Sequence, residues 1–244
     1  MPDITDDKKR SRGLINENEI TPYLHLTSTE IHKMLHSENP VMRSIAAVLF
    51  KKKININDNK TALILAKALK KETQLYTRLE LCRTLESGGI KTAEVMCDYL
   101  GKIGKNQYHT LPDRPSLKKS YPLPRDIIAR SLARMDPVIL PVLTAILKGK
   151  NVQQTSEILD AIGFLIFYNS IEEKEKISRE IIIQFEKYKH NPLIQWKCIT
   201  CLSAFSDSNC TDILTEIINS SMNPLFVSKA KRSLSLIQNR NIII

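Results

Sequence analysis

The same helix start occurs three times along the chain. Asn39-Pro40, Asn191-Pro192 and Asn223-Pro224 each open a segment of helical apolar spacing. Asn is a preferred N-cap residue, and Pro suits the first helical position because the N–H that it lacks would be unpaired there anyway. Recurrence of one local signal at distant positions predicts a chain built from similar helical units stacked in order.

Aligning the chain on Arg43, three residues after Pro40, reveals further units. Apolar or small residues return three, four and seven positions after each anchor, which places them on one helical face. The stripes are Ala46, Ala47 and Phe50; Leu81, Cys82 and Leu85; Ile128, Ala129 and Leu132; Ile158, Leu159 and Ile162; Cys198, Ile199 and Leu202; and the weaker Ala230 and Leu234. Six such stripes predict six second helices of helix pairs.

A first helix is expected before each of these. The predicted spans are 28–37, 58–71, 91–101, 136–148, 171–188 and 211–220. Thr27 and Glu30 form a capping-box sequence at the first start, and Asp136-Pro137 repeats the cap-then-proline pattern. Successive anchors are 30 to 47 residues apart, a period typical of two-helix repeats in α-solenoids.

The segment Asn-Pro-Val-Met-Arg-Ser-Ile-Ala-Ala-Val-Leu at residues 39–49 resembles the second helix of a HEAT repeat. The resemblance covers about residues 27–240 and is sharpest in the first, third and fifth units. It implies an all-α fold, a right-handed α-α superhelix of about six HEAT-like helix pairs. It also implies that the anchor arginines Arg43, Arg78 and Arg125 hydrogen-bond within the stack.

The predicted organisation is one solenoid domain over 27–240, preceded by a polar arm or cap over 1–26. Residues 102–123 stretch the third unit with a proline-rich, basic insertion that contains Tyr108 and Tyr121. Long segments inside compact repeats are often functional. Two interpretations of this insertion stay open: a plain surface insertion, or a loop that contacts a partner.

Positive charge is concentrated in the first half of the chain. The 244 residues carry a net charge of +10, and residues 27–150 alone contain 22 Lys or Arg against 11 Asp or Glu. Such a surface attracts an acidic protein or a phosphate backbone, although a lysine-rich solvated exterior would have the same composition.

The second helices of a HEAT-like solenoid line its concave face, so residues opposite the apolar stripes should form an open concave stripe. Counted from the anchors, these residues are Ser44, Val48 and Lys51; Leu79, Arg83 and Glu86; Asp126, Arg130 and Ala133; Ser156, Asp160 and Gly163; Trp196, Thr200 and Ser203; and Ser228, Arg232 and Ser235. Arginines and lysines in or beside this stripe predict a basic partner-binding surface, and the single tryptophan could anchor a partner or simply pack between helices. The candidate partner-binding residues are Lys51, Arg83, Arg130, Arg134, Trp196 and Arg232.

Motifs for catalysis or for a cofactor are not found in the sequence. His32 and His36 lack the zinc-protease pattern, and Gly88-Gly89 suits a helix end better than a phosphate loop. Cys198 and Cys201 form a C-x-x-C within a helical apolar pattern, which favours core packing; Cys210 nearby keeps a metal or redox site as the minority alternative. We therefore expect no metal, no cofactor and no enzyme activity.

These features predict a non-catalytic scaffold or adaptor that binds a protein partner with an acidic surface on the concave face. The alternative is a nucleic-acid backbone binder that uses the basic half; a HEAT-like DNA glycosylase, with Asp126, Asp160 and Trp196 in its groove, is less favoured. The charged start lacks a signal-peptide pattern, and no apolar run could span a membrane, so a cytoplasmic location is expected.

Overall fold

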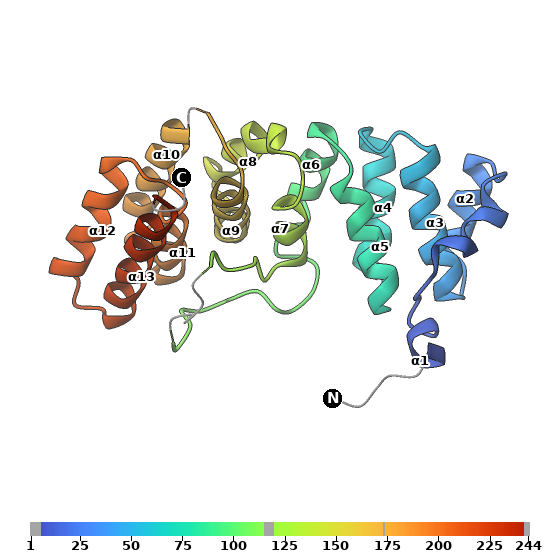
Figure 1. Cartoon of the computed structure of the whole chain (residues 1–244), viewed down its shortest axis with the longest axis horizontal. Helices are drawn as coiled ribbons and strands as arrows, with labels where there is room; N and C mark the ends of the chain where they lie inside the picture. The colour runs from blue at the N-terminus through green and yellow to red at the C-terminus, as the bar shows by residue number, and fades with distance from the viewer. Residues whose placement is uncertain (1–5, 115–119, 173, 242–244) are drawn as a thin grey trace. The chain divides into compact units, whose positions relative to one another are not determined.

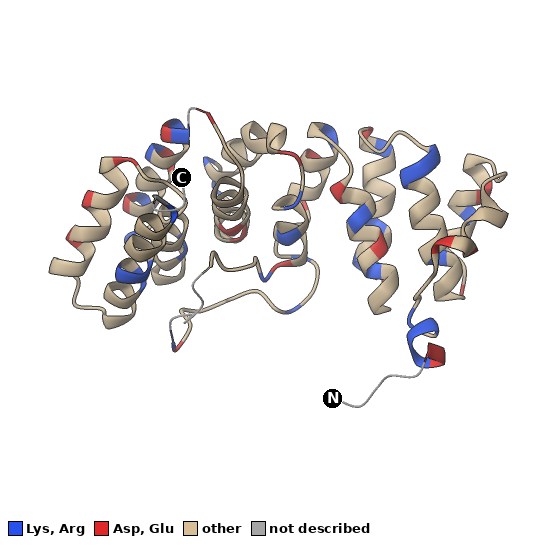
Figure 2. Cartoon of the chain, viewed as in Figure 1, with Lys and Arg blue, Asp and Glu red and all other residues tan. Residues whose placement is uncertain are grey.

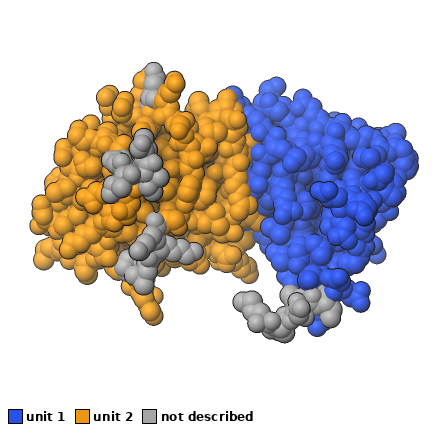
Figure 3. Space-filling model, viewed as in Figure 1, with its two compact units in different colours: residues 1–103 blue, residues 104–244 orange. Residues whose placement is uncertain are grey.

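The computed structural model describes residues 6–114, 120–172 and 174–241. Within these ranges every regular element is helical and no strand occurs, which confirms the all-α prediction. The chain divides into two compact units, residues 1–103 and residues 104–244 (Figure 3). The boundary falls inside the third predicted helix pair, at the start of the insertion.

Unit 1 stacks successive helix pairs in two layers. In one layer α3 packs against α5, and in the other α4 packs against α6, while α2 with α3 and α4 with α5 join the layers (Figure 1). The elements are α1 (Asp6–Arg10), the 3-10 turns η1 (Glu17–Glu19) and η2 (Thr21–Tyr23), α2 (Ser28–Met34), α3 (Pro40–Lys53), α4 (Asn59–Lys71), α5 (Leu75–Glu86) and α6 (Ile90–Cys97).

Unit 2 repeats this arrangement. Helices α9, α11 and α13 pack side by side, and each also packs against the helix that precedes it in sequence, α8, α10 and α12 respectively. The elements are α7 (Ile127–Leu132), η3 (Pro137–Ile139), α8 (Leu140–Leu147), α9 (Val152–Tyr168), α10 (Lys174–Lys187), α11 (Pro192–Leu202), α12 (Ser208–Ser220) and α13 (Pro224–Asn241).

The helix starts follow the capping chemistry of the sequence. The Asn39, Asn191 and Asn223 side chains accept hydrogen bonds from the N–H groups two or three residues later, at 2.9, 3.1 and 3.0 Å. Thr27 and Glu30 form the expected capping box. One predicted helix is different, because residues 136–148 form the turn η3 followed by α8. Pro141, in the first turn of α8, has no N–H to continue a helix from η3.

The apolar stripes meet in the core of each unit. Ala46, Ala47 and Phe50 are fully buried, as are Ile158, Leu159 and Ile162 in α9. Burying a large aliphatic or aromatic side chain contributes roughly 1.5–3 kcal/mol. Because each stripe lies between neighbouring helices, this contribution depends on the adjacent helix pair being folded.

Buried hydroxyl groups tie second helices to one another. Ser44 donates to Gly13 O at 2.7 Å, Thr84 donates to Ala47 O at 2.8 Å, and Ser233 donates to Ile199 O at 2.8 Å. The last two bonds link α5 to α3 and α13 to α11. Ser44 was expected on the open concave stripe, and that expectation is wrong, because its hydroxyl is sealed between α3, α5 and the chain around Gly13.

The Arg43 guanidinium joins α3 to the turn between α4 and α5. It donates to both carboxylate oxygens of Glu72, at 2.7 and 2.9 Å, and to the Ser37 and Glu38 carbonyls. Burial raises the pKa of Glu72, but hydrogen bonds from Arg43 and from backbone N–H groups outweigh burial and leave that pKa lowered. The structural role expected for this anchor arginine is confirmed.

We expect Arg43→Ala to lower the free energy of unfolding by about 1.5–3 kcal/mol, because it removes charged hydrogen bonds from a carboxylate that is mostly buried. Urea denaturation measures the loss, and Arg83→Ala is the control, since its exposed pair with Glu80 should contribute less than about 1 kcal/mol. The depressed pKa of Glu72 stabilises the fold above about pH 4.5, its ordinary value, and this part of the difference disappears as the pH falls below it. Equal losses in the two variants would contradict the assignment.

Candidate functional site

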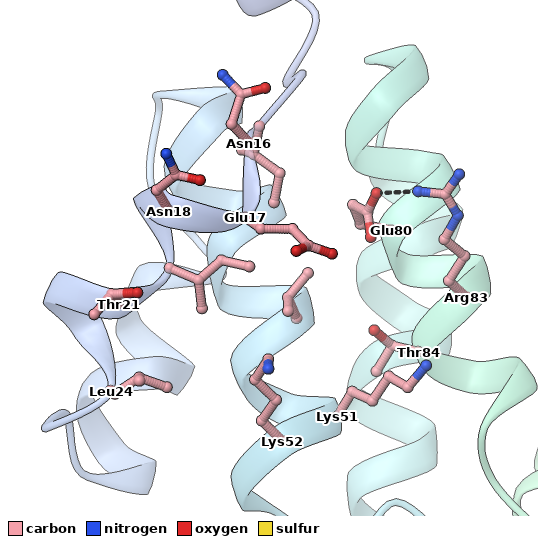
Figure 4. A pocket seen from close by; sticks show the side chains of 13 residues that line it. Asn16, Glu17, Asn18, Thr21, Leu24, Lys51, Lys52, Glu80, Arg83 and Thr84 are labelled. Atoms are coloured by element: carbon pink, nitrogen blue, oxygen red, sulfur yellow. Dashed lines mark hydrogen bonds and ion pairs between the residues drawn. The ribbon is translucent and has the colours of Figure 1, made fainter.

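A groove of about 870 Å³ lies in unit 1 between the N-terminal segment, α3 and α5 (Figure 4). We call it the unit-1 groove. Its lining combines aliphatic side chains with charged groups of both signs. The lining residues are Ile15, Asn16, Glu17, Asn18, Ile20, Thr21, Leu24, Val48, Lys51, Lys52, Glu80, Arg83 and Thr84.

The N-terminal wall of this groove is fixed by three contacts. Arg10 forms a two-bond ion pair with Glu19, at 2.6 and 3.0 Å. Gly13 has a φ of 89°, and a Cβ there would lie 2.2 Å from Thr77 Oγ1, so glycine is required for this close approach. Tyr76 N–H donates to Arg12 O at the start of α5. Residues 10–24 therefore pack against the helices as a capping segment.

The three consecutive lysines that end α3 have different roles. Lys53 reaches across to the Leu24 and Leu26 carbonyls and holds the segment that carries η2 beside α3. Lys51 and Lys52 line the unit-1 groove, and Figure 4 shows both side chains extending from α3, with Lys51 directed toward Thr84. One structural lysine thus leaves two exposed cations at the groove.

Two carboxylates partly offset the positive charge of the unit-1 groove. Arg83 pairs with Glu80 on the same face of α5, and Glu17 extends from η1 into the space between α3 and α5 (Figure 4). Exposed pairs of this kind are worth about 0–1 kcal/mol, so Arg83 can exchange Glu80 for another carboxylate at little cost. Figure 2 shows the same mixture more widely, with Asp and Glu interspersed among Lys and Arg in both units.

Of the six candidate partner-binding residues, the structure brings Lys51 and Arg83 together in this groove. The other four lie in unit 2. Arg232 donates to Ser120 O of the insertion at 2.7 Å, and Arg130 donates to Pro124 O, directly after the insertion, at 2.9 Å. Arg134 is exposed just after α7. Trp196 is only 6% exposed and packs edge-on against Tyr108, with the ring centroids 5.6 Å apart. Of the two interpretations of this tryptophan, the structure therefore favours packing between helices.

The insertion covers residues that were expected to be open. Tyr121 is 3% exposed and packs on Phe164 and Phe167 of α9, and Arg125 donates to Asn106 O and to the Tyr108 hydroxyl. A Cβ on Gly163 would lie 1.8 Å from the Tyr121 oxygen. The expectation of an open concave stripe is therefore wrong for α9 and α11, where Ser156, Gly163, Trp196, Thr200 and Ser203 are buried. Residues 115–119 of the insertion lie outside the described residues.

A buried ionic cluster lies between α9 and α11, and the sequence analysis missed it. Lys197 is 1% exposed and contacts Glu157 at 2.9 Å and Asp160 at 3.0 Å. Burial raises the pKa of Glu157 to about 7, whereas the two carboxylates outweigh burial and raise the pKa of Lys197. The sequence signal was faint: Glu157 and Lys197 each stand directly before a stripe residue.

A second buried lysine places its ammonium group over an aromatic ring. Lys229 of α13 is fully buried, its Nζ lies 4.2 Å from the Trp196 ring centroid, and that nitrogen has no hydrogen-bond partner within the described structure. Burial, with Arg232 nearby, lowers the pKa of Lys229 to about 7.

The three cysteines around the C-x-x-C sequence lie in the core of unit 2. Cys198, Cys201 and Cys210 are fully buried, and burial raises the pKa of each thiol, which disfavours the thiolate that redox or metal chemistry needs. This supports the core-packing interpretation. His32 packs edge-on against Phe50. Among the described residues no group of three or more His, Cys, Asp or Glu side chains could hold a metal ion.

Comparisons with known proteins do not identify a family. No protein-family profile and no curated protein matches the chain. A crystal structure of an engineered protein is similar at 14% identity and a TM-score of 0.40, over 95% of this chain and 62% of the engineered one. That degree of likeness establishes neither family nor function. None of the helices in the described ranges is long and apolar enough to cross a membrane.

We expect Lys229→Met to raise the free energy of unfolding at neutral pH by about 1–3 kcal/mol, because it replaces a buried, unpartnered ammonium with an apolar chain of similar length. The pKa of Lys229 falls from 10.5 unfolded to about 7 folded, so its cost is absent above pH 10.5, grows as the pH falls and is complete below about pH 7. Urea denaturation at neutral pH and near pH 10 measures both effects. The exposed Lys231→Met should change stability by less than about 0.5 kcal/mol, and a destabilised Lys229→Met protein would contradict the assignment.

Proposed function

We propose that this protein is a non-catalytic HEAT-repeat scaffold, or adaptor, that binds a protein partner with an acidic surface in the unit-1 groove. The supporting observation is the groove itself, where Ile15, Ile20 and Val48 provide apolar contact beside Lys51 and Lys52. An extended or helical segment with both apolar and acidic side chains matches that lining.

The packing of the helices supports the solenoid part of the proposal. Second helices pack on second helices within each unit, and the first helices α4 with α6 and α8 with α10 also pack together, which matches the nearest-neighbour arrangement of repeat proteins. Continuation of that arrangement as a right-handed superhelix of six pairs belongs to the proposal. Repeat proteins of this kind act by presenting a long surface, and such a role requires no catalytic residues.

The charges of the groove favour a protein over a nucleic acid. Among the residues that the structure describes, three basic side chains line it beside two carboxylates, Glu17 and Glu80, and no aromatic side chain lines it for stacking on bases. Glu17 and Glu80 offset much of the positive charge that a run of phosphates would need, whereas a peptide segment also gains apolar contacts with Ile15, Ile20 and Val48. Binding of a nucleic-acid backbone is therefore the alternative function, which the experiment below distinguishes from the proposed one.

The test is the affinity of an amphipathic acidic peptide for the triple variant Lys51→Gln, Lys52→Gln, Arg83→Gln. We expect roughly tenfold weaker binding, because each exposed charge contact contributes about 0.2–1 kcal/mol. The matched control is Lys60→Gln, Lys70→Gln, Lys91→Gln, which removes three exposed lysines of unit 1 that do not line the groove.

Salt distinguishes the alternatives in the same experiment. Peptide binding should weaken only modestly with salt, because apolar contacts persist. Duplex DNA or RNA bound through three phosphates, one for each basic side chain of the groove, would lose roughly 40-fold in affinity between 50 and 200 mM salt. Equal binding by the two triple variants would remove the groove from the proposal. Tight, strongly salt-dependent binding of duplex DNA or RNA without peptide binding would replace the scaffold with the alternative.

A further inference from the structure

A second cavity, of about 420 Å³, lies wholly within unit 2. This unit-2 cavity opens between the insertion and the first turns of α9 and α11. Its lining residues are Gln107, Tyr108, His109, Val152, Gln153, Ser156, Glu157, Asn191, Leu193 and Ile194. Neither the apolar stripes nor the unit-1 groove accounts for it.

Glu157 brings an incompletely paired carboxylate to this cavity. The residue is 2% exposed, and its Oε1 accepts hydrogen bonds from Lys197 Nζ at 2.9 Å and from Ser156 Oγ at 3.2 Å. Its Oε2 is buried and has no hydrogen-bond partner within the described structure. A buried acceptor without a donor costs about 1–3 kcal/mol, more when it is charged, so a ligand that supplies an N–H there would remove that cost.

The charge balance at Glu157 favours a cation. Lys197 is shared between Glu157 and Asp160. A third carboxylate, that of Asp126, lies near enough to raise the pKa of Glu157, and Lys229 is the other lysine near Asp160. Among the described residues, no lysine or arginine lines the cavity, and His109 is the one basic residue of the lining. A cationic ligand would therefore complete the pairing of the cluster, while an anion would meet an excess of negative charge.

The chemistry of the lining restricts the class of cation further. Only one carboxylate oxygen of Glu157 is available, which suits the single point charge of an ammonium better than a guanidinium, whose planar fork pairs best with two oxygens. Val152, Leu193 and Ile194 offer aliphatic contact for methylene groups. The remaining described lining residues are polar: Gln107, Tyr108, His109, Gln153, Ser156 and Asn191.

We propose that the unit-2 cavity binds a primary ammonium group carried on an aliphatic chain, with Glu157 as its counter-ion. The ligand has two sources with the same chemistry, a free alkylamine or the lysine side chain of a partner. This site is independent of the unit-1 groove, so failure of one proposal leaves the other standing.

The probe is n-butylamine, titrated at about pH 8, where the amine is protonated and Glu157, with a pKa of about 7, is ionised. Trp196 is the single tryptophan and lies 5.6 Å from Tyr108, a lining residue, so tryptophan fluorescence reports on the cavity. Amide chemical shifts of Val152 and Gln153 give a second, local readout. We expect saturable changes with n-butylamine and none with n-butanol, which has the same chain without the charge.

Two variants test the counter-ion. Glu157→Gln keeps the shape, leaves Lys197 paired with Asp160, and should weaken n-butylamine binding at least about tenfold. Val152→Arg adds a positive charge at a lining position that is 47% exposed, and should weaken binding without touching the ionic cluster. Lys148→Gln, which changes an exposed charge outside the cavity, should bind like the wild type. Circular dichroism and thermal unfolding confirm that each variant is folded.

The two sources are separated by a short lysine peptide and the same peptide with Nε-acetyllysine. Tighter binding of the lysine peptide than of n-butylamine assigns the cavity to a partner's side chain, and the reverse assigns it to a free amine; the acetylated peptide should not bind in either case. No saturable binding to the folded wild type, or equal binding by wild type, Glu157→Gln and Val152→Arg, would overturn the proposal.

Discussion

Each helix pair of this protein depends on its neighbours to bury its apolar stripe. A single pair would leave Ala46, Ala47 and Phe50, or their equivalents, exposed on one side. In the structure these stripes lie between consecutive second helices, where burial of apolar surface is the dominant favourable contribution to folding. Because the dependence is local, a pair tolerates irregular connections, provided that the next pair packs in register.

Polar contacts then fix how neighbouring helices meet. Hydroxyl groups such as that of Thr84 donate to carbonyls of the adjacent second helix, and Arg43 clamps α3 to the following turn through Glu72. These groups are buried or half-buried, so each would be costly if its partner moved away. The apolar stripes favour stacking in general, and the polar ties select one relative placement.

The two units use their equivalent surfaces differently. In unit 1 the N-terminal segment is held at the side of α3 and α5 and leaves a groove with Lys51 and Lys52. In unit 2 the insertion covers α9 and α11 through Tyr121 and Tyr108, and Glu157 lines the cavity beside it. The two surfaces therefore differ in charge: two exposed lysines lie at the unit-1 groove, and a buried carboxylate lies at the unit-2 cavity.

The sequence by itself determined the helical fold, the helix starts and most of the core, because caps and apolar spacing act within a few residues of one another. The Asn39 and Thr27 caps form as predicted, and Arg43 makes the structural hydrogen bonds that were expected of it. Only the tertiary structure decided which faces are open. Trp196 and Gly163 have the spacing of exposed positions, yet they are covered by Tyr108 and Tyr121 from the insertion, far away in sequence. The pairing of Lys197 with Glu157, 40 residues apart, likewise depends on α9 and α11 lying side by side, which local spacing does not encode.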